Sequence, residues 1–335
     1  ISVFRTIAEN RHLPSLKGEK SELAVRGDIV SNDNFKIASS KKLYKESIDT
    51  RDLDPVKREL GVNLFSIYSN TYYKVLENRL IEGEKNPGNL ILSYGINSRS
   101  AKNLKELAFK LIQLDVFKSR QVNGNKILRG LTISESGEKR TFSYEDTLTP
   151  VVGYISKFES EAGKTKVNGI KGLERNYNKV LNQSKDGVLQ GDRDVLSYIS
   201  FDKNSVIRKR IDGATLNLNI PLKLQKNIEM TLDSYKQKLT ADEIIVAVME
   251  SRTGKVITMA SSNRFNPEQI KKEDIPSLNV NAIEYQFEPG SVIKPLSISL
   301  AIDKNLVKKN ENCPAYDSGG GRNAAGEYPK GAYKI

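Results

Sequence analysis

The chain has very few of the residues on which many enzyme sites depend. It holds one histidine, His12, and one cysteine, Cys313, among 335 residues. A Ser-His-Asp triad or a histidine-based zinc site would rest on a single side chain in a polar segment near the start. Cys313 has no partner for an internal disulfide and no metal-ligand pattern around it. We therefore expect no cofactor and no metal, and lysine becomes the natural candidate for a general base.

Long apolar runs are absent too, since no uninterrupted stretch reaches membrane-spanning length. A composition of 38% hydrophobic and 28% charged residues predicts a soluble, rather polar protein. The length leaves room for two or more domains.

The net charge of +12 raises the question whether the protein binds nucleic acid. We expect no nucleic-acid partner, because the basic residues are interleaved with acids. No Cys/His finger, aromatic RNA-binding block or phosphate-binding glycine loop is present in the sequence. Local runs such as Arg208-Lys209-Arg210 and Lys308-Lys309 are interpreted as solvated faces. The alternative is attraction to an anionic membrane surface or to cell-wall polymer.

One segment near the C-terminal end combines a Pro-Gly turn, a serine and a lysine at helical spacing. It reads Phe-Glu-Pro-Gly-Ser-Val-Ile-Lys-Pro over residues 287–295, and an apolar stretch follows to Ile302. Residues i and i+3 share a helix face, so Lys294 can reach the Ser291 hydroxyl, and a lysine in a dry pocket loses its charge more easily. A helix beginning at Ser291 would also direct the N–H groups of its first turn toward developing negative charge.

The Ser-x-x-Lys spacing alone is weak evidence for a catalytic pair, because it occurs four times in the chain. The other three pairs lie in polar, charged stretches and are interpreted as solvated surface: Ser39/Lys42, Ser136/Lys139 and Ser200/Lys203. The alternative for Ser291 is a helix N-cap serine, with Lys294 pointing to water.

Periodicity predicts mixed strands and helices over the first two thirds of the chain. We expect strands over 35–38, 43–48 and 90–94, and helices over 62–80, 100–113 and 173–181, with Ser100 as an N-cap. Residues 148–155 are expected to cross between subdomains, and the polar stretch 208–213 is the preferred domain boundary. Residues 318–321 are interpreted as a flexible loop or an introduced linker.

Several blocks, quoted in chain order, resemble class B penicillin-binding proteins. The active-site segment of that family is Tyr-Glu-Pro-Gly-Ser-x-x-Lys-Pro, and here only the tyrosine is replaced, by Phe287. The blocks are Val25-Arg26-Gly27-Asp28-Ile29, Gly169-Ile170-Lys171-Gly172-Leu173-Glu174-x-x-Tyr177, a strand and helix over 216–232 with Leu224-Gln225, a hairpin over 244–261 running into Phe265-Asn266-Pro267, and the Ser291 segment. Their order is far more specific than any one block.

The resemblance implies an α+β multidomain protein. Residues 1–210 would form an elongated pedestal of the dimerisation type, and residues 211–335 the first part of a transpeptidase domain, whose antiparallel sheet is flanked by helices. The implied reaction is acyl transfer on D-Ala-D-Ala stem peptides of peptidoglycan, with Ser291 as nucleophile and oxyanion-hole N–H donor and Lys294 as base. β-Lactams would acylate the same serine. We favour a division-type enzyme over an elongation-type one, because no long insertion precedes the Gly-Leu-Glu block.

The sequence departs from the family pattern after Ser291. The expected Ser-x-Asn and Lys-Thr/Ser-Gly motifs are not found downstream. Ser261-Ser262-Asn263 precedes Ser291 and is interpreted as a coincidence, and Lys330-Gly331-Ala332 lacks the middle residue. We therefore expect an incomplete transpeptidase domain, which would not be a competent enzyme by itself, and an N-terminal membrane anchor that lies outside this sequence.

The resemblance also implies a cellular location and a set of partners. The catalytic part would lie in the periplasm, on a bacterial inner-membrane protein with one N-terminal anchor. Partners would be peptidoglycan stem peptides and their lipid-linked glycan, β-lactams, a membrane glycosyltransferase and division proteins. Two alternatives stay open: a β-lactam-sensing or β-lactam-hydrolysing serine enzyme, and a non-catalytic divisome scaffold that binds partners through its pedestal.

Overall fold

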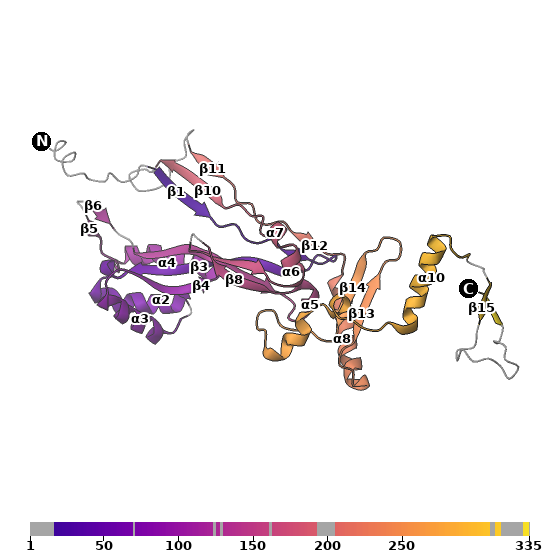
Figure 1. The fold of residues 1–335 in the computed structure, drawn as a ribbon. Helices are drawn as coiled ribbons and strands as arrows, with labels where there is room; N and C mark the ends of the chain where they lie inside the picture. The colour runs from indigo at the N-terminus through magenta and orange to yellow at the C-terminus, as the bar shows by residue number, and fades with distance from the viewer. Residues whose placement is uncertain are drawn as a thin grey trace. The chain divides into compact units, whose positions relative to one another are not determined.

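The computed structural model describes residues 17–69, 71–122, 125–127, 130–160, 163–192, 205–308, 312–315 and 331–334 (Figure 1). His12, the Ser200/Lys203 pair and the 318–321 loop lie outside these ranges. Two compact units span Ile1–Glu284 and Tyr285–Ile335. Within the described ranges, no helix is long and apolar enough to cross a membrane. The helices, strands and layers match the expected α+β fold class, which the structure confirms.

A seven-stranded sheet runs through the first unit. Its core is the antiparallel pair β3 (Lys36–Asp49) and β7 (Leu131–Phe142), which pair from Ala38↔Phe142 to Ile48↔Leu131. The remaining strands are β12 (Leu216–Asn217), β2 (Ile29–Val30), β9 (Thr165–Gly169), β8 (Ile155–Glu159) and β4 (Asn89–Ile96), which pairs with β3. The two short strands expected over 35–38 and 43–48 are therefore one long strand.

Three helices cover one end of this sheet: α2 (Arg58–Ser69), α3 (Tyr73–Lys85) and α4 (Ser98–Gln113) (Figure 1). Leu104, Leu107 and Leu111 of α4 are fully buried and share a face, as the helical spacing predicts. The single helix expected over 62–80 is wrong, because α2 ends at Ser69 and α3 begins at Tyr73. The N-cap of α4 is Asn97, whose side chain accepts the Ser100 N–H at 2.9 Å, rather than Ser100 itself.

A separate three-stranded antiparallel sheet holds β1 (Lys17–Glu22), β10 (Gly187–Asp192) and β11 (Val206–Arg208) in the order β1-β10-β11. The remaining described elements before β10 are the hairpin of β5 (Arg120–Val122) and β6 (Asn125–Ile127), the 3-10 turns η1 (Thr50–Asp52) and η2 (Pro55–Lys57), and the short helices α5 (Thr149–Val152), α6 (Gly172–Asn176) and α7 (Asn178–Leu181). The expected helix over 173–181 is thus two short helices, and the 148–155 stretch forms α5 and the start of β8.

The Arg-Gly block near the start and the Gly-Leu-Glu block meet in a buried network. Arg26 Nε donates to Glu174 Oε2 at 2.8 Å, and Arg140 Nε donates to Glu174 Oε1 at 2.8 Å. Glycines of both blocks lie against backbone: a Cβ on Gly27 would lie 2.0 Å from the Ala214 carbonyl oxygen, and one on Gly169 would lie 2.0 Å from the Glu174 carbonyl oxygen. Two blocks 148 residues apart in sequence therefore form one structural feature.

The part of the first unit after residue 210 packs against the pedestal. Ile220 and Leu222 belong to the buried cluster that holds Ile29, Ile37 and Leu148. The elements that follow are α8 (Leu222–Leu239), the hairpin β13 (Ile245–Met249) and β14 (Val256–Ser261), η3 (Lys272–Leu278) and α9 (Asn281–Glu284). The expected strand, helix and hairpin of this region are confirmed. The boundary at residues 208–213 stays a prediction.

Candidate active site

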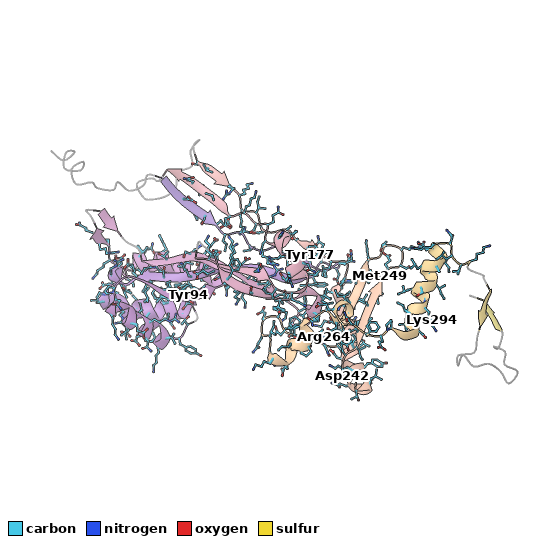
Figure 2. All side chains as sticks on the ribbon, in the orientation of Figure 1. Tyr94, Tyr177, Asp242, Met249, Arg264 and Lys294 are labelled. Atoms are coloured by element: carbon cyan, nitrogen blue, oxygen red, sulfur yellow. The ribbon has the colours of Figure 1, made fainter. Side chains whose placement is uncertain are left out.

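Ser291 and Lys294 belong to one helical turn. The 3-10 turn η4 (Gly290–Ile293) runs directly into α10 (Lys294–Asp303), on which Figure 2 labels Lys294. The Lys294 backbone N–H donates to the Ser291 carbonyl oxygen. Residues i and i+3 of a 3-10 turn eclipse each other. The local backbone therefore places both predicted site residues on the same side of the turn.

The Pro289-Gly290 pair initiates this turn. Gly290 has φ +55°, in the left-handed region that glycine adopts without strain, and Val292 N–H donates to the Pro289 carbonyl oxygen at 3.3 Å. Pro295 lies in the first turn of α10, where its missing N–H costs little. The helix does not begin at Ser291 as expected, because the 3-10 turn begins at Gly290 and the α-helix at Lys294. Ser291 is not an N-cap either, since Pro289 holds that place without a side-chain cap.

Both side chains are exposed, and both belong to the second unit. The apolar residues around them are exposed as well, with 71% of Val292, 66% of Leu296 and 57% of Leu300 accessible. The described residues 285–308 thus leave this helix without an apolar cover. A dry environment for Lys294 has to come from residues outside that range.

Two of the other Ser-x-x-Lys pairs differ from the expectation of solvated surface. Ser39 and Ser136 are each only 9% exposed and lie in β3 and β7. Ser39 Oγ shares a hydrogen bond with Thr141 Oγ1 at 3.2 Å. Residues 39–42 of β3 pair regularly, so Ser39 and Lys42 point to opposite faces, and Ser136 lies at a register shift between β7 and β3 rather than in a helical turn. The geometry therefore separates these pairs from Ser291 and Lys294.

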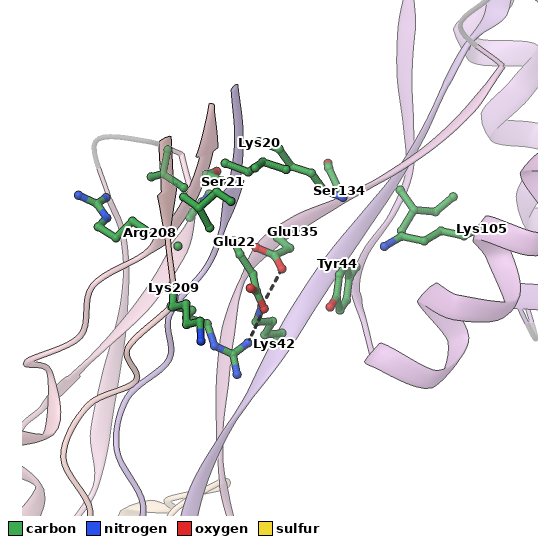
Figure 3. A pocket seen from close by; sticks show the side chains of 17 residues that line it. Lys20, Ser21, Glu22, Lys42, Tyr44, Lys105, Ser134, Glu135, Arg208 and Lys209 are labelled. Atoms are coloured by element: carbon green, nitrogen blue, oxygen red, sulfur yellow. Dashed lines mark hydrogen bonds and ion pairs between the residues drawn. The ribbon is translucent and has the colours of Figure 1, made fainter. Parts of the chain in front are cut away.

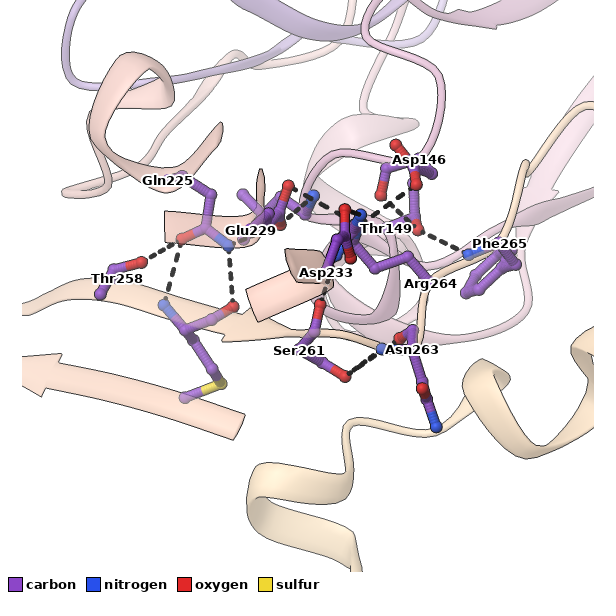
Figure 4. Close-up of polar contacts among 12 residues, drawn as sticks. Asp146, Thr149, Gln225, Glu229, Asp233, Thr258, Ser261, Asn263, Arg264 and Phe265 are labelled. Atoms are coloured by element: carbon purple, nitrogen blue, oxygen red, sulfur yellow. Dashed lines mark hydrogen bonds and ion pairs between the residues drawn. The ribbon is translucent and has the colours of Figure 1, made fainter. Parts of the chain in front are cut away.

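A polar network joins α8 and β14 to the pedestal (Figure 4). Glu229 Oε1 accepts the Leu148 N–H at 3.0 Å and the Gln225 Nε2–H at 2.8 Å, and burial raises the pKa of the Glu229 carboxyl. Arg264 Nη2 donates to Asp233 at 2.7 Å, and Arg264 Nε donates to Asp146 at 3.2 Å. Of this network, the sequence pointed only to Gln225. The signal that could have revealed the rest is the polar pair Gln225 and Glu229, spaced i, i+4 on the inner face of the amphipathic helix α8.

Ser261-Ser262-Asn263 has a structural role at the end of β14. The Ser261 hydroxyl donates to Glu243 at 2.6 Å and accepts the Asn263 N–H at 2.9 Å. Ser262 Oγ accepts the Ile244 N–H at 2.9 Å, next to the start of β13. Of the Lys330-Gly331-Ala332 stretch, only Gly331 and Ala332 are described, in β16 (Gly331–Lys334), which pairs with β15 (Asn312–Ala315). Among the described residues, no cluster of three or more His, Cys, Asp or Glu could hold a metal ion.

Family comparison matches most of the chain. Residues 21–218 match the family described as Penicillin-binding Protein dimerisation domain, and residues 244–331 match the Penicillin binding protein transpeptidase domain. The second match contains Ser291 and Lys294.

Two curated relatives show how far the similarity extends. Peptidoglycan D,D-transpeptidase FtsI of Buchnera aphidicola is 31% identical over 142 residues, which cover 42% of this chain and 24% of the relative. Stage V sporulation protein D of Bacillus subtilis is 24% identical over 305 residues, which cover 88% of this chain and 41% of the relative. The chain thus spans less than half the length of these relatives.

Solved structures share the fold. Penicillin Binding Protein 2X from Streptococcus thermophilus aligns with a TM-score of 0.65 at 17% identity, covering 89% of this chain and 43% of that one. PBP2 from Helicobacter pylori, solved in complex with MreC, aligns with a TM-score of 0.53 at 18% identity, covering 90% of this chain and 55% of that one. From the two domain matches in this order and the buried pedestal network, this chain belongs to the class B penicillin-binding proteins.

Proposed function

We propose that the protein containing this chain cross-links peptidoglycan by serine acyl transfer on D-Ala-D-Ala stem peptides. The observation that carries the proposal is the η4 turn, in which the Lys294 N–H bonds to the Ser291 carbonyl, inside a stretch that matches a transpeptidase domain. Ser291 is the nucleophile and Lys294 the general base. No cofactor enters the reaction.

The chemistry has two acyl-transfer steps. Lys294 Nζ, in its neutral form, takes the hydroxyl proton as Ser291 Oγ attacks the penultimate D-alanine carbonyl. The oxyanion that forms accepts a hydrogen bond from the Ser291 backbone N–H, and the terminal D-alanine leaves with the proton as a free amino acid. An amine from a neighbouring stem peptide then attacks the ester, which releases Ser291 and forms the cross-link. A β-lactam would acylate Ser291 by opening its strained amide in the first step.

The role we favour is septal synthesis during cell division. It is supported by similarity to relatives named FtsI. A membrane glycosyltransferase and division proteins are the proposed partners. We place the catalytic part in the periplasm, on an inner-membrane protein with one N-terminal anchor, and keep residues 208–213 as the boundary between pedestal and transpeptidase domain.

Release of D-alanine from a pentapeptide substrate by the full-length protein tests the proposal. A transpeptidase transfers the acyl group to an added amine and holds a β-lactam acyl group for hours. Rapid hydrolysis of the β-lactam ester would favour a lactamase instead. Partner binding that survives Ser291→Ala, with no D-alanine release by the parent protein, would favour a scaffold.

A further inference from the structure

A basic groove of about 830 Å³ lies in the pedestal between the three-stranded sheet and β7 of the large sheet (Figure 3). We define it by residues 20–22 of β1, 133–135 of β7 and 207–210 at the end of β11. The family motifs do not account for it, and it lies within the first unit.

The acidic side chains of the groove are already neutralised. Lys42 Nζ lies 2.9 Å from Glu22 Oε1 and 2.8 Å from Glu135 Oε1, and Arg210 Nη1 lies 2.9 Å from the same Glu22 oxygen. The hydrogen bond from Lys42 is the main reason that the pKa of Glu22 is lowered. Glu135 Oε2 also accepts the Leu23 N–H at 2.5 Å. These two carboxylates therefore cannot neutralise further cations.

Four other cations line the groove without a carboxylate partner among the described residues: Lys20, Lys105, Arg208 and Lys209. Arg208 Nε donates to the backbone oxygen of Asp186 at 3.1 Å, and Lys105 Nζ lies 5.4 Å from the centre of the Tyr44 ring. Neither contact cancels the positive charge. A concave wall with uncompensated charge of one sign attracts ligands of the opposite sign.

A strand edge flanks the groove. Among the described residues, β1 pairs only with β10, so its other edge carries no strand. Unpaired strand edges accept an added extended chain through main-chain hydrogen bonds. Apolar side chains between the cations, such as Ile133, Leu189 and Ile207, offer pockets for alternate residues of such a chain.

From these features we propose that the groove binds an extended acidic segment of a partner protein, which adds as a strand along β1. The cations select its acidic residues, and the apolar side chains receive the residues between them. A membrane surface fits less well, because the cations line a concavity between two sheets. Cell-wall polymer would satisfy the charge but would not use the strand edge.

Fluorescence anisotropy with a rhodamine-labelled decapeptide of alternating glutamate and valine tests this on the full chain. We expect Lys20→Glu/Arg208→Glu to weaken binding at least about tenfold relative to Lys74→Glu/Lys226→Glu, which makes the same change in net charge on exposed helices. N-methylation of alternate peptide bonds keeps the peptide's charge and should also weaken binding about tenfold. Circular dichroism of each variant checks the fold, and Lys20→Gln/Lys105→Gln replaces the reversal variant if that one does not fold.

Equal weakening by the groove and control variants would overturn the proposal, because net charge alone would then explain binding. N-methylated peptide, polyglutamate or anionic lipid vesicles binding as tightly as the parent peptide would also overturn it, in favour of general attraction to polyanions or membranes.

Discussion

Arg26 Nη2 and Glu174 Oε2 lie 2.7 Å apart, with neither side chain exposed to solvent. Arg26 Nη2 also donates to the Glu174 carbonyl oxygen at 2.7 Å, and Arg26 Nη1 donates to Asn178 Oδ1 at 2.7 Å. Because Arg140 shares the same carboxylate, Glu174 balances two buried guanidinium groups. This arrangement ties the first strands of the pedestal to α6 and α7.

Glu174→Gln should destabilise the pedestal by about 3–5 kcal/mol, because two buried cations lose their counter-charge. Urea unfolding followed by tyrosine fluorescence measures the loss. Glu273→Gln removes an exposed partner of Lys271, 3.2 Å away, and should cost less than about 1 kcal/mol. Equal midpoints for Glu174→Gln and the parent protein would show that the buried pair does not hold this region together.

Gly27→Ala should destabilise the same region, at the upper end of about 1–3 kcal/mol or beyond. The added Cβ would lie 2.0 Å from the Ala214 carbonyl oxygen, so backbone has to move. Gly88→Ala is the matched control, because a Cβ there meets nothing within 4 Å. Similar thermal midpoints for the two variants would contradict the close backbone contact.

Because Glu46 is buried, we expect the stability of the fold to depend on pH. Its side chain is fully buried in β3, neither carboxylate oxygen has a hydrogen-bond partner among the described residues, and burial raises its pKa to about 7. The folded pKa is above the unfolded value, so the stability associated with the neutral acid is complete below about pH 4.5 and is lost as pH rises to about 7. The loss is at most about 3 kcal/mol.

Glu46→Gln should remove this part of the pH dependence and raise the free energy of unfolding above pH 7. Urea titrations between pH 4 and 8 measure both effects, with Glu82→Gln on the exposed side of α3 as the control. A parallel pH profile for Glu46→Gln and the parent protein would mean that Glu46 does not titrate in the folded state.

Arg264→Met should loosen the attachment of α8 and β14 to the pedestal. The variant leaves Asp146 and Asp233 without their shared cation and removes the 2.7 Å bond to the Ser261 carbonyl. We expect faster amide exchange in α8 and a loss of about 1–3 kcal/mol. Arg252→Met, in the exposed β13–β14 turn, should leave α8 exchange unchanged; an equal effect of both variants would exclude a specific role for the network.

The sequence predicted local structure better than it predicted contacts. The β13–β14 hairpin, α8 and the inner face of α4 follow from periodicity and from the family blocks. The split between α2 and α3 was missed, because no proline or glycine marks the break between Ser69 and Tyr73. Burial of Glu46 was missed because polar residues, Lys45 and Ser47, stand on both sides of it in the strand. The register that buries Glu46 comes from its pairing with β7, some 90 positions away in the sequence.

For the candidate site, too, the sequence predicted the local structure and not the surroundings. Ser291 and Lys294 are joined by a local turn, so their spacing could be interpreted from the sequence. Their environment depends on packing by distant segments, which no local pattern encodes. The meeting of Arg26 with Glu174 was likewise beyond spacing arguments, since only the fold brings residues 148 positions apart together.

Lys294 should be the base in the acylation of Ser291. Lys294→Ala should slow penicillin acylation of the full-length protein by about 10²–10⁴-fold, and Lys294→Arg should not restore it, because a guanidinium stays protonated. Stopped-flow acylation kinetics measure both rates. An arginine variant with parental rates would remove Lys294 from that role.

The central claim is that Ser291 is the nucleophile, and covalent labelling tests it most directly. Full-length protein is incubated with a fluorescent penicillin, digested, and the labelled peptide identified by mass spectrometry. We expect one penicilloyl group on Ser291, its loss in Ser291→Ala, and its retention in Ser297→Ala, one turn further along α10. Undiminished labelling of Ser291→Ala would contradict the account.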